Sequence, residues 1–152
     1  MVAFLKLENV LYNLYKQAGR KPIRERGITW KEEYEERSIP LKKRFDKKIG
    51  PGSYRRWKGH DYTTNSEYII VVGPSIKRGV GKMFFAGIKK IPAKDLRDEK
   101  KKIYSPYGEY FPTIKAAYSY ASRKWGVPFP KNQIAYTAQG IANIDIPQHV
   151  KA

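Results

Sequence analysis

The sequence contains no cysteine, only two histidines and only 14 acidic residues among 152. The missing cysteine excludes disulfides, thiolate metal sites and a cysteine nucleophile. No apolar run reaches 18 residues, so no segment is predicted to span a membrane. Residues 1–9 include a Lys and a Glu within their apolar part, which is not typical of a secretory signal. We therefore expect a soluble protein that is intracellular (in a host cytoplasm) or lies inside a virion.

Basic residues dominate the charge. There are 31 Lys and Arg, which give a net charge of +17 at neutral pH. Residues 1–60 hold 16 basic and 7 acidic groups, residues 61–103 hold 10 and 5, and residues 104–152 hold 5 and 2. The usual partner of so basic a chain is nucleic acid, whose phosphates release counterions on binding. An acidic protein surface is the alternative partner.

The first 50 residues carry three helical patterns. Apolar residues recur at three-four spacing over residues 4–18, and Gly19 ends that pattern. Thr29 and Glu32 have capping-box spacing, which predicts a short acidic helix over residues 29–36. Residues 40–49 predict another helix that begins with Pro40 and ends before Gly50-Pro51.

The middle of the chain indicates loops and hairpins. Residues 53–58 read Ser-Tyr-Arg-Arg-Trp-Lys between glycines, which predicts a basic-aromatic loop. Residues 68–72 are β-branched and predict a strand closed by Gly73-Pro74, with a partner strand over residues 83–88. The connection over residues 74–79 places two cations at a hairpin tip. A second hairpin is predicted over residues 103–111, with its turn at residues 105–108.

The last third has clear helix signals. Thr113 is the predicted N-cap of a helix that ends at Gly126, and Asn132 is the predicted N-cap of a second short helix ending at Gly140. Two short helices across a proline-containing turn are similar to a helix-turn-helix. Residues 141–146 alternate and predict an edge strand.

These patterns predict an α+β fold. It combines basic helices at the N-terminus, a small antiparallel sheet of hairpins and a C-terminal helix-turn-helix-like unit. The domain division is residues 1–60 and 61–152, or a single domain over residues 1–152.

None of three candidate catalytic or phosphate-binding motifs has the residues or the setting that its chemistry needs. His60 and Asp61 are adjacent, so on an extended chain their side chains point to opposite sides. Asp98-Glu99-Lys100 lies in a charged tract without a strand pattern. Residues 79–83 lack both the first glycine and the Ser/Thr of a phosphate-binding loop. We expect no enzyme activity, no metal and no cofactor.

Basic and aromatic side chains are interleaved, as in proteins that contact phosphates with cations and stack rings on bases. In a helix-turn-helix, the side chains that would face base edges are Asn132, Gln133, Tyr136 and Thr137, and Asn and Gln suit adenine. The predicted nucleic-acid-binding residues are Lys42, Lys43, Arg55, Arg56, Trp57, Lys58, Lys77, Arg78, Lys82, Arg123, Lys124, Lys131, Asn132, Gln133 and Tyr136.

Residues 103–117 read Ile-Tyr-Ser-Pro-Tyr-Gly-Glu-Tyr-Phe-Pro-Thr-Ile-Lys-Ala-Ala. This segment resembles a DNA-binding module of phage proteins that occurs beside homing-endonuclease domains. Ser105-Pro106, Gly108, Phe111, Thr113-Ile114 and Ala116-Ala117 occupy its motif positions. The resemblance implies DNA contact by the helices that follow. Nothing in residues 1–102 resembles the associated nuclease.

The sequence thus predicts a non-enzymatic, phage-encoded protein that binds nucleic acid, with double-stranded DNA favoured. The alternative is a structural virion or assembly protein whose basic face docks acidic protein subunits.

Overall fold

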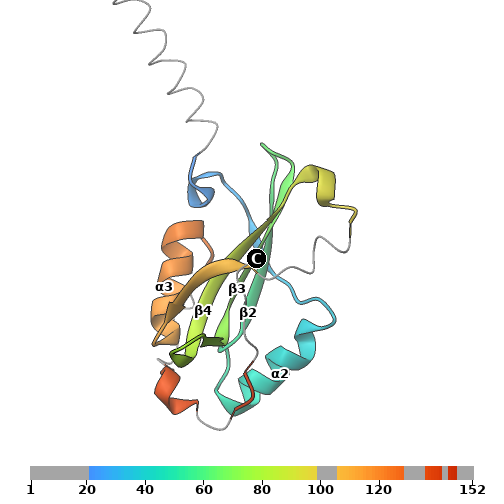
Figure 1. Cartoon of the computed structure of the whole chain (residues 1–152). Helices are drawn as coiled ribbons and strands as arrows, with labels where there is room; N and C mark the ends of the chain where they lie inside the picture. The colour runs from blue at the N-terminus through green and yellow to red at the C-terminus, as the bar shows by residue number, and fades with distance from the viewer. Residues whose placement is uncertain (1–20, 99–105, 129–135, 142–143, 147–152) are drawn as a thin grey trace, which may run out of the picture.

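The computed structural model describes residues 21–98, 106–128, 136–141 and 144–146. Its elements are η1 (Ile23–Glu25), β1 (Trp30–Glu32), α2 (Ser38–Lys48), β2 (Arg55–Asp61), β3 (Ser66–Lys77), β4 (Gly81–Ile91), η2 (Ala93–Asp95), β5 (Tyr107–Phe111), α3 (Ile114–Trp125) and η4 (Ala138–Gly140). The five strands form one antiparallel sheet in the order β1-β2-β3-β4-β5 (Figure 1). The predicted α+β class with an antiparallel sheet is confirmed. Strands from both sides of residue 60 belong to this sheet.

The core lies between the sheet and the elements that cover it. Residues 68–75 of β3 are all buried, so both faces of this strand are covered. Helix α3 contacts β3, β4 and β5 and buries an apolar stripe spaced three or four apart, which includes Tyr118 and Trp125. Phe45 of α2 packs against Tyr54, just before β2, and the two ring centroids are 6.0 Å apart.

The acidic helix predicted at residues 29–36 is wrong. Residues 30–32 form β1, which pairs with β2 in the register Trp30↔Gly59 to Glu32↔Trp57. The Trp30 indole N–H donates to the backbone carbonyl of Trp125 at 3.0 Å, and its ring packs edge-on against Tyr68. These long-range contacts of Trp30, together with strand pairing, stabilise a strand where the capping-box spacing favours a helix.

The predicted basic-aromatic loop at residues 53–58 is also wrong. Arg55–Asp61 form β2, which pairs with β1 on one side and β3 on the other. Trp57 is only 2% exposed and meets Tyr118 at a ring-centroid distance of 5.9 Å. The strand alternates buried and partly exposed residues from Trp57 onward, so its cations sit between core positions.

Strands β3 and β4 are longer than predicted. Gly73-Pro74 does not close β3, which continues to Lys77 in the register Pro74↔Phe84 and Lys77↔Gly81. Pairing with β2 stops at Val72, so at Pro74 the strand has a neighbour on one side only. Proline is tolerated there because an edge position needs no second ladder bond.

Helix α3 confirms the prediction at both ends. The Thr113 hydroxyl accepts from the backbone N–H of Ala116 at 3.1 Å, which makes it the N-cap. Gly126 follows Trp125 with φ of 77°, the left-handed conformation that glycine favours. Helix α2 likewise begins and ends close to the predicted residues 40–49.

The C-terminal segment differs from the prediction in three places. Tyr136 and Thr137 are extended, and Thr137 forms an antiparallel bridge with Thr113. A single 3₁₀ turn, η4, follows over Ala138–Gly140, so this part of the predicted second helix is wrong and a helix-turn-helix unit is not confirmed. Residues 141 and 144–146 are not in a strand, and residues 107–108 belong to β5 rather than to a turn. The predicted helix over residues 4–18, the strand at 103–104 and residues 131–133 lie outside the described residues.

Candidate nucleic-acid interface

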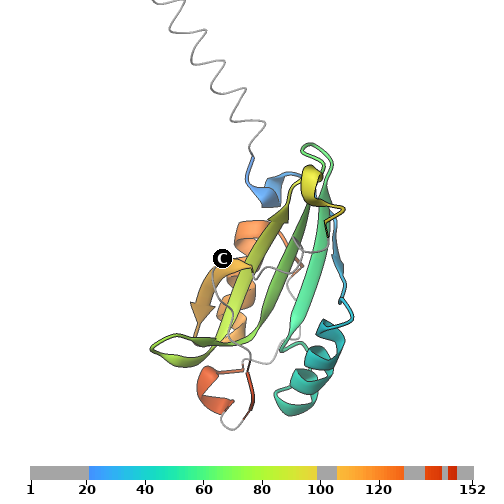
Figure 2. The same ribbon diagram turned by 45° about the vertical axis from the view of Figure 1, so that its right-hand side comes forward.

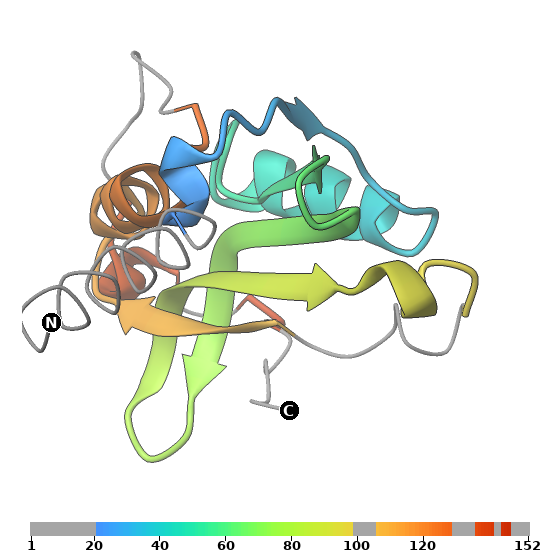
Figure 3. The ribbon, with the colours of Figure 1, turned by 90° about the horizontal axis from the view of Figure 1, so that it is seen from above.

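A two-stranded ribbon projects from one end of the sheet. Strand β2 pairs with β3 only as far as Val72, and β5 pairs with β4 only from Phe84 onward. Residues 75–77 and 81–83 therefore pair only with each other, and we call residues 75–83 the hairpin arm. Figures 2 and 3 show the arm as a loop that extends beyond the rest of the sheet.

The tip of the arm is basic and exposed. Lys77, Arg78, Gly79 and Val80 are all exposed, and Val80 retains 66% of its accessible surface. Gly79 and Gly81 have φ values of 80° and 114°, which are strained for other residues, so glycine at these positions permits this tight turn. The prediction that two cations lie at this hairpin tip is confirmed.

Other segments reach the same end of the molecule. The Lys82 ammonium donates to the carbonyl of Ile141 at 3.1 Å, which joins the arm to the segment after Thr137. The Tyr136 hydroxyl donates to the carbonyl of Pro51 at 3.5 Å, just after α2. In Figure 2 the arm, η4 and α2 all lie towards the lower end of the molecule, and Figure 3 shows the arm and α2 on different sides of it.

Cations that are far apart in the sequence lie exposed towards this end of the molecule. We call the exposed set the basic end; it comprises Lys47 and Lys48 of α2, Lys77 and Arg78 of the arm, and Lys115 in the first turn of α3. Within the described part of the chain, none of these five side chains forms an ion pair. The basic end is therefore a surface of uncompensated positive charge.

The sequence prediction missed Lys47, Lys48 and Lys115. The polar face of α3 identifies Lys115 as exposed, but the position of the start of α3 at this end of the sheet depends on the pairing of Phe111 with Phe84. Lys47 and Lys48 occupy the last turn of α2, where cations also complement the helix dipole.

The cations of β2 and α2 that were predicted to bind a ligand mostly have protein partners. Lys42 forms an ion pair of 2.6 Å with Asp46, whereas Lys43 is exposed. Arg56 lies 3.3 Å from Glu35. Lys58 lies 3.6 Å from Glu67.

Arg55 and Trp57 do not face solvent freely either. The Arg55 guanidinium packs against Gly52. A Cβ atom added at Gly52 would lie only 3.3 Å from the Nε of Arg55. Trp57 is in the core. The structure therefore does not bring Arg55, Arg56, Trp57 and Lys58 together as one exposed patch.

Arg123 and Lys124 lie at the other end of the molecule. They occupy the last turn of α3, where the Arg123 carbonyl accepts from the Arg24 guanidinium at 3.1 Å. Trp125 in the same turn is bonded to Trp30, which packs on Tyr68 near the start of β3. Lys77 is nine residues further along that strand, a separation of about 30 Å. Arg123 and Lys124 therefore lie apart from the basic end.

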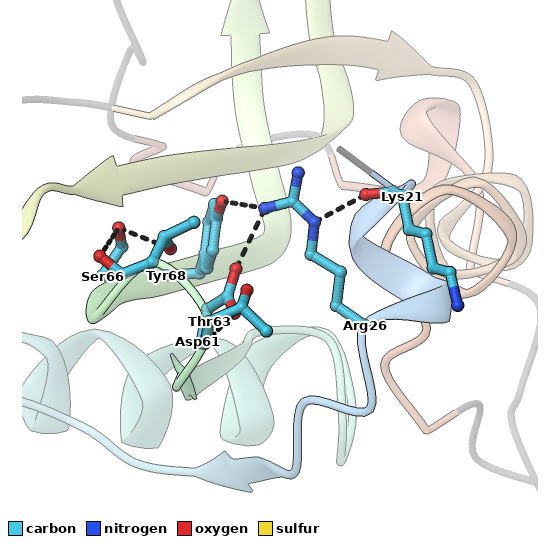
Figure 4. Close-up of polar contacts among 7 residues, drawn as sticks. Lys21, Arg26, Asp61, Thr63, Ser66 and Tyr68 are labelled. Carbon is cyan, nitrogen blue, oxygen red and sulfur yellow. Dashed lines mark hydrogen bonds and ion pairs between the residues drawn. The ribbon is translucent and has the colours of Figure 1, made fainter. Parts of the chain in front are cut away.

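A buried ion pair fixes the end opposite the arm. The Arg26 guanidinium lies 2.9 Å from the Asp61 carboxylate and also donates to the Tyr68 hydroxyl and to the Lys21 carbonyl (Figure 4). The other Asp61 oxygen accepts from the hydroxyl and the backbone N–H of Thr63. Burial favours a higher pKa for Asp61, but the hydrogen bonds from Thr63 and Arg26 outweigh it and lower the pKa to about 2.

No protein-family model matches the chain, and neither a curated protein nor a solved structure shows significant similarity to it. In the described part of the chain, no helix is both long and apolar enough to span a bilayer. No group of three or more His, Asp or Glu side chains is close enough to hold a metal ion among the same residues.

Proposed function

We propose that this protein is a non-enzymatic nucleic-acid-binding protein that holds double-stranded DNA at its basic end. The observation that carries the proposal is the hairpin arm, which projects Lys77 and Arg78 into solvent without an acidic partner in the described residues. Lys47, Lys48 and Lys115 are exposed towards the same end of the molecule and would contact further phosphates.

The shape of the arm favours DNA over RNA. The major groove of B-form DNA is about 12 Å wide and admits a two-stranded β-ribbon. The major groove of A-form RNA is deep and narrow, and side chains cannot read it. A ribbon with cations at its tip therefore suits a B-form duplex.

The cations supply affinity rather than sequence selection. Lysines at the basic end would neutralise phosphates and release counterions, which makes binding dependent on salt. Base readout by Asn132 and Gln133, and a phage origin as the resemblance of residues 103–117 implies, remain parts of this proposal. Such a protein would act in the host cytoplasm or in a virion.

Titration of a labelled DNA duplex at several salt concentrations tests the proposal. We expect the logarithm of the association constant to fall with the logarithm of salt by a slope of about 4.5, since each of the cations of the basic end would neutralise one phosphate at about 0.9 per phosphate. An RNA duplex of the same sequence should bind more weakly. Absence of DNA binding at about 50 mM salt would overturn the proposal.

A further inference from the structure

A cavity of about 340 Å³ lies on the sheet away from the basic end. Its walls come from β1, the end of β2, the following turn and the start of β3. The side chains that matter chemically are Lys31, Glu33, Lys58, His60, Tyr62 and Glu67. Its volume is within the usual range for small-molecule sites, about 300–1,000 Å³.

Two lysines face each other across the strands of this cavity. Lys31 of β1 is the register partner of Lys58 of β2, so their Cβ atoms lie about 5 Å apart on one face. Like charges directly opposite are destabilising. Glu67 lies 3.6 Å from Lys58, whereas Lys31 is exposed and forms no ion pair with any described residue. Glu67 compensates Lys58 alone, so an anionic group bound beside Lys31 would supply the counter-charge that Lys31 lacks.

An exposed aromatic ring stands beside the lysines. Tyr62 is 88% exposed, and its ring centroid lies 4.5 Å from that of His60. The residue between them is Asp61, whose bonds to Arg26 and Thr63 hold the turn (Figure 4). Tyr62 therefore extends from a fixed turn, and its ring faces are open for stacking against a planar ligand.

The acidic residue Glu33 sets a further requirement. It is exposed on the β1 side of the cavity and forms no ion pair with the described residues. Lys31 would attract a small anion, whereas Glu33 would repel it. A larger ligand can place its anion at Lys31 and a hydrogen-bond donor at Glu33.

We propose that this cavity binds a nucleoside monophosphate unit. Its phosphate would lie between Lys31 and Lys58, its base would stack on Tyr62, and an amino or hydroxyl group would donate to Glu33. The unit is either a free nucleotide or an unpaired nucleotide of a single strand. None of these residues belongs to the basic end, so this proposal does not depend on duplex binding.

Calorimetric titration of the full chain tests the cavity. The ligands are AMP, adenosine, inorganic phosphate and a 5′-phosphorylated single-stranded oligonucleotide. We expect AMP or the oligonucleotide to bind at least about tenfold more tightly than adenosine or phosphate, because only they offer base and phosphate together. If AMP binds, a free nucleotide is sufficient to occupy the cavity. If only the oligonucleotide binds, the ligand is a nucleotide within a single strand.

Variants connect that binding to the cavity. Lys31→Gln should weaken this binding about tenfold, because it removes a positive charge beside the phosphate. Tyr62→Ala should weaken it by a similar factor, since stacking contributes about 1–3 kcal/mol per base. Lys94→Gln is the matched control, since Lys94 is exposed and outside the cavity lining. The proposal is overturned if neither nucleotide ligand binds at about 1 mM, if phosphate alone binds as tightly, or if both cavity variants bind like the control.

Discussion

The Arg26 guanidinium lies 2.9 Å from the carboxylate of Asp61, a residue 35 positions away that is only 1% exposed. This ion pair connects the segment before β1 to the last residue of β2. Removal of one partner from a buried pair leaves the other without compensation, which is far more costly than loss of a surface pair.

Replacement of Asp61 by Asn should lower the free energy of unfolding by about 3 kcal/mol, because it leaves the Arg26 guanidinium partly buried without a counter-charge. Urea denaturation measures the change. Asp145→Asn is the matched control, since Asp145 is exposed, and it should stay within about 0.5 kcal/mol of the parent. Equal effects of the two variants would mean that the ion pair contributes nothing specific.

The same carboxylate makes stability depend on pH. Its pKa is about 2 in the folded protein, below its usual value of 3.8, so the unfolded chain binds the proton more readily. The contribution is complete above about pH 4 and is lost as the pH falls towards 2; it is on the order of 2 kcal/mol. Unfolding measured between pH 6 and pH 2 should show this loss in the parent. In Asp61→Asn it should be missing.

Trp57 distinguishes a core role from a ligand-stacking role. Because its ring is buried against Tyr118, Trp57→Ala should lower the free energy of unfolding by about 3–5 kcal/mol. Tyr62→Ala removes an aromatic ring that is 88% exposed and should change stability by less than about 0.5 kcal/mol. Thermal or urea denaturation compares the two. If Trp57→Ala were as stable as the parent, the assignment of Trp57 to the core would be wrong.

Thr113 tests the cap of α3. Thr113→Ala removes the hydroxyl that accepts from Ala116 and should lower the free energy of unfolding by about 1 kcal/mol. Thr113→Ser keeps an acceptor in the same place and should recover most of the loss. If Ser and Ala are equally destabilising, the lost methyl group rather than the cap explains the effect.

Local signals were sufficient to predict α3 from the sequence. Its N-cap, apolar spacing and terminal glycine all lie within 14 consecutive residues, from Thr113 to Gly126. Strand β1 depends instead on the bond between Trp30 and Trp125, 95 positions apart, which no local pattern reveals. The extension of β3 through Pro74 depends on where β2 stops pairing, which is also a tertiary property.

In the candidate interface, too, some features were predictable from local sequence and others depend on tertiary structure. Lys77 and Arg78 could be predicted because a glycine-containing turn between two strands is a local feature. The ion pairs of Arg56 with Glu35 and of Lys58 with Glu67 were not predictable, because they depend on the tertiary structure. The hydrogen bond from Tyr136 to Pro51, just after α2, was not predictable, since it joins residues 85 positions apart.

The salt dependence of duplex binding by arm variants tests the central claim most directly. Lys77→Gln with Arg78→Gln removes two cations from the arm, and the matched control is Lys90→Gln with Lys94→Gln, two exposed lysines outside the basic end. We predict that the arm variant reduces the slope of log association constant against log salt by about 2, while the control keeps the parental slope. Equal slopes for the two double variants would contradict the assignment of DNA binding to the hairpin arm.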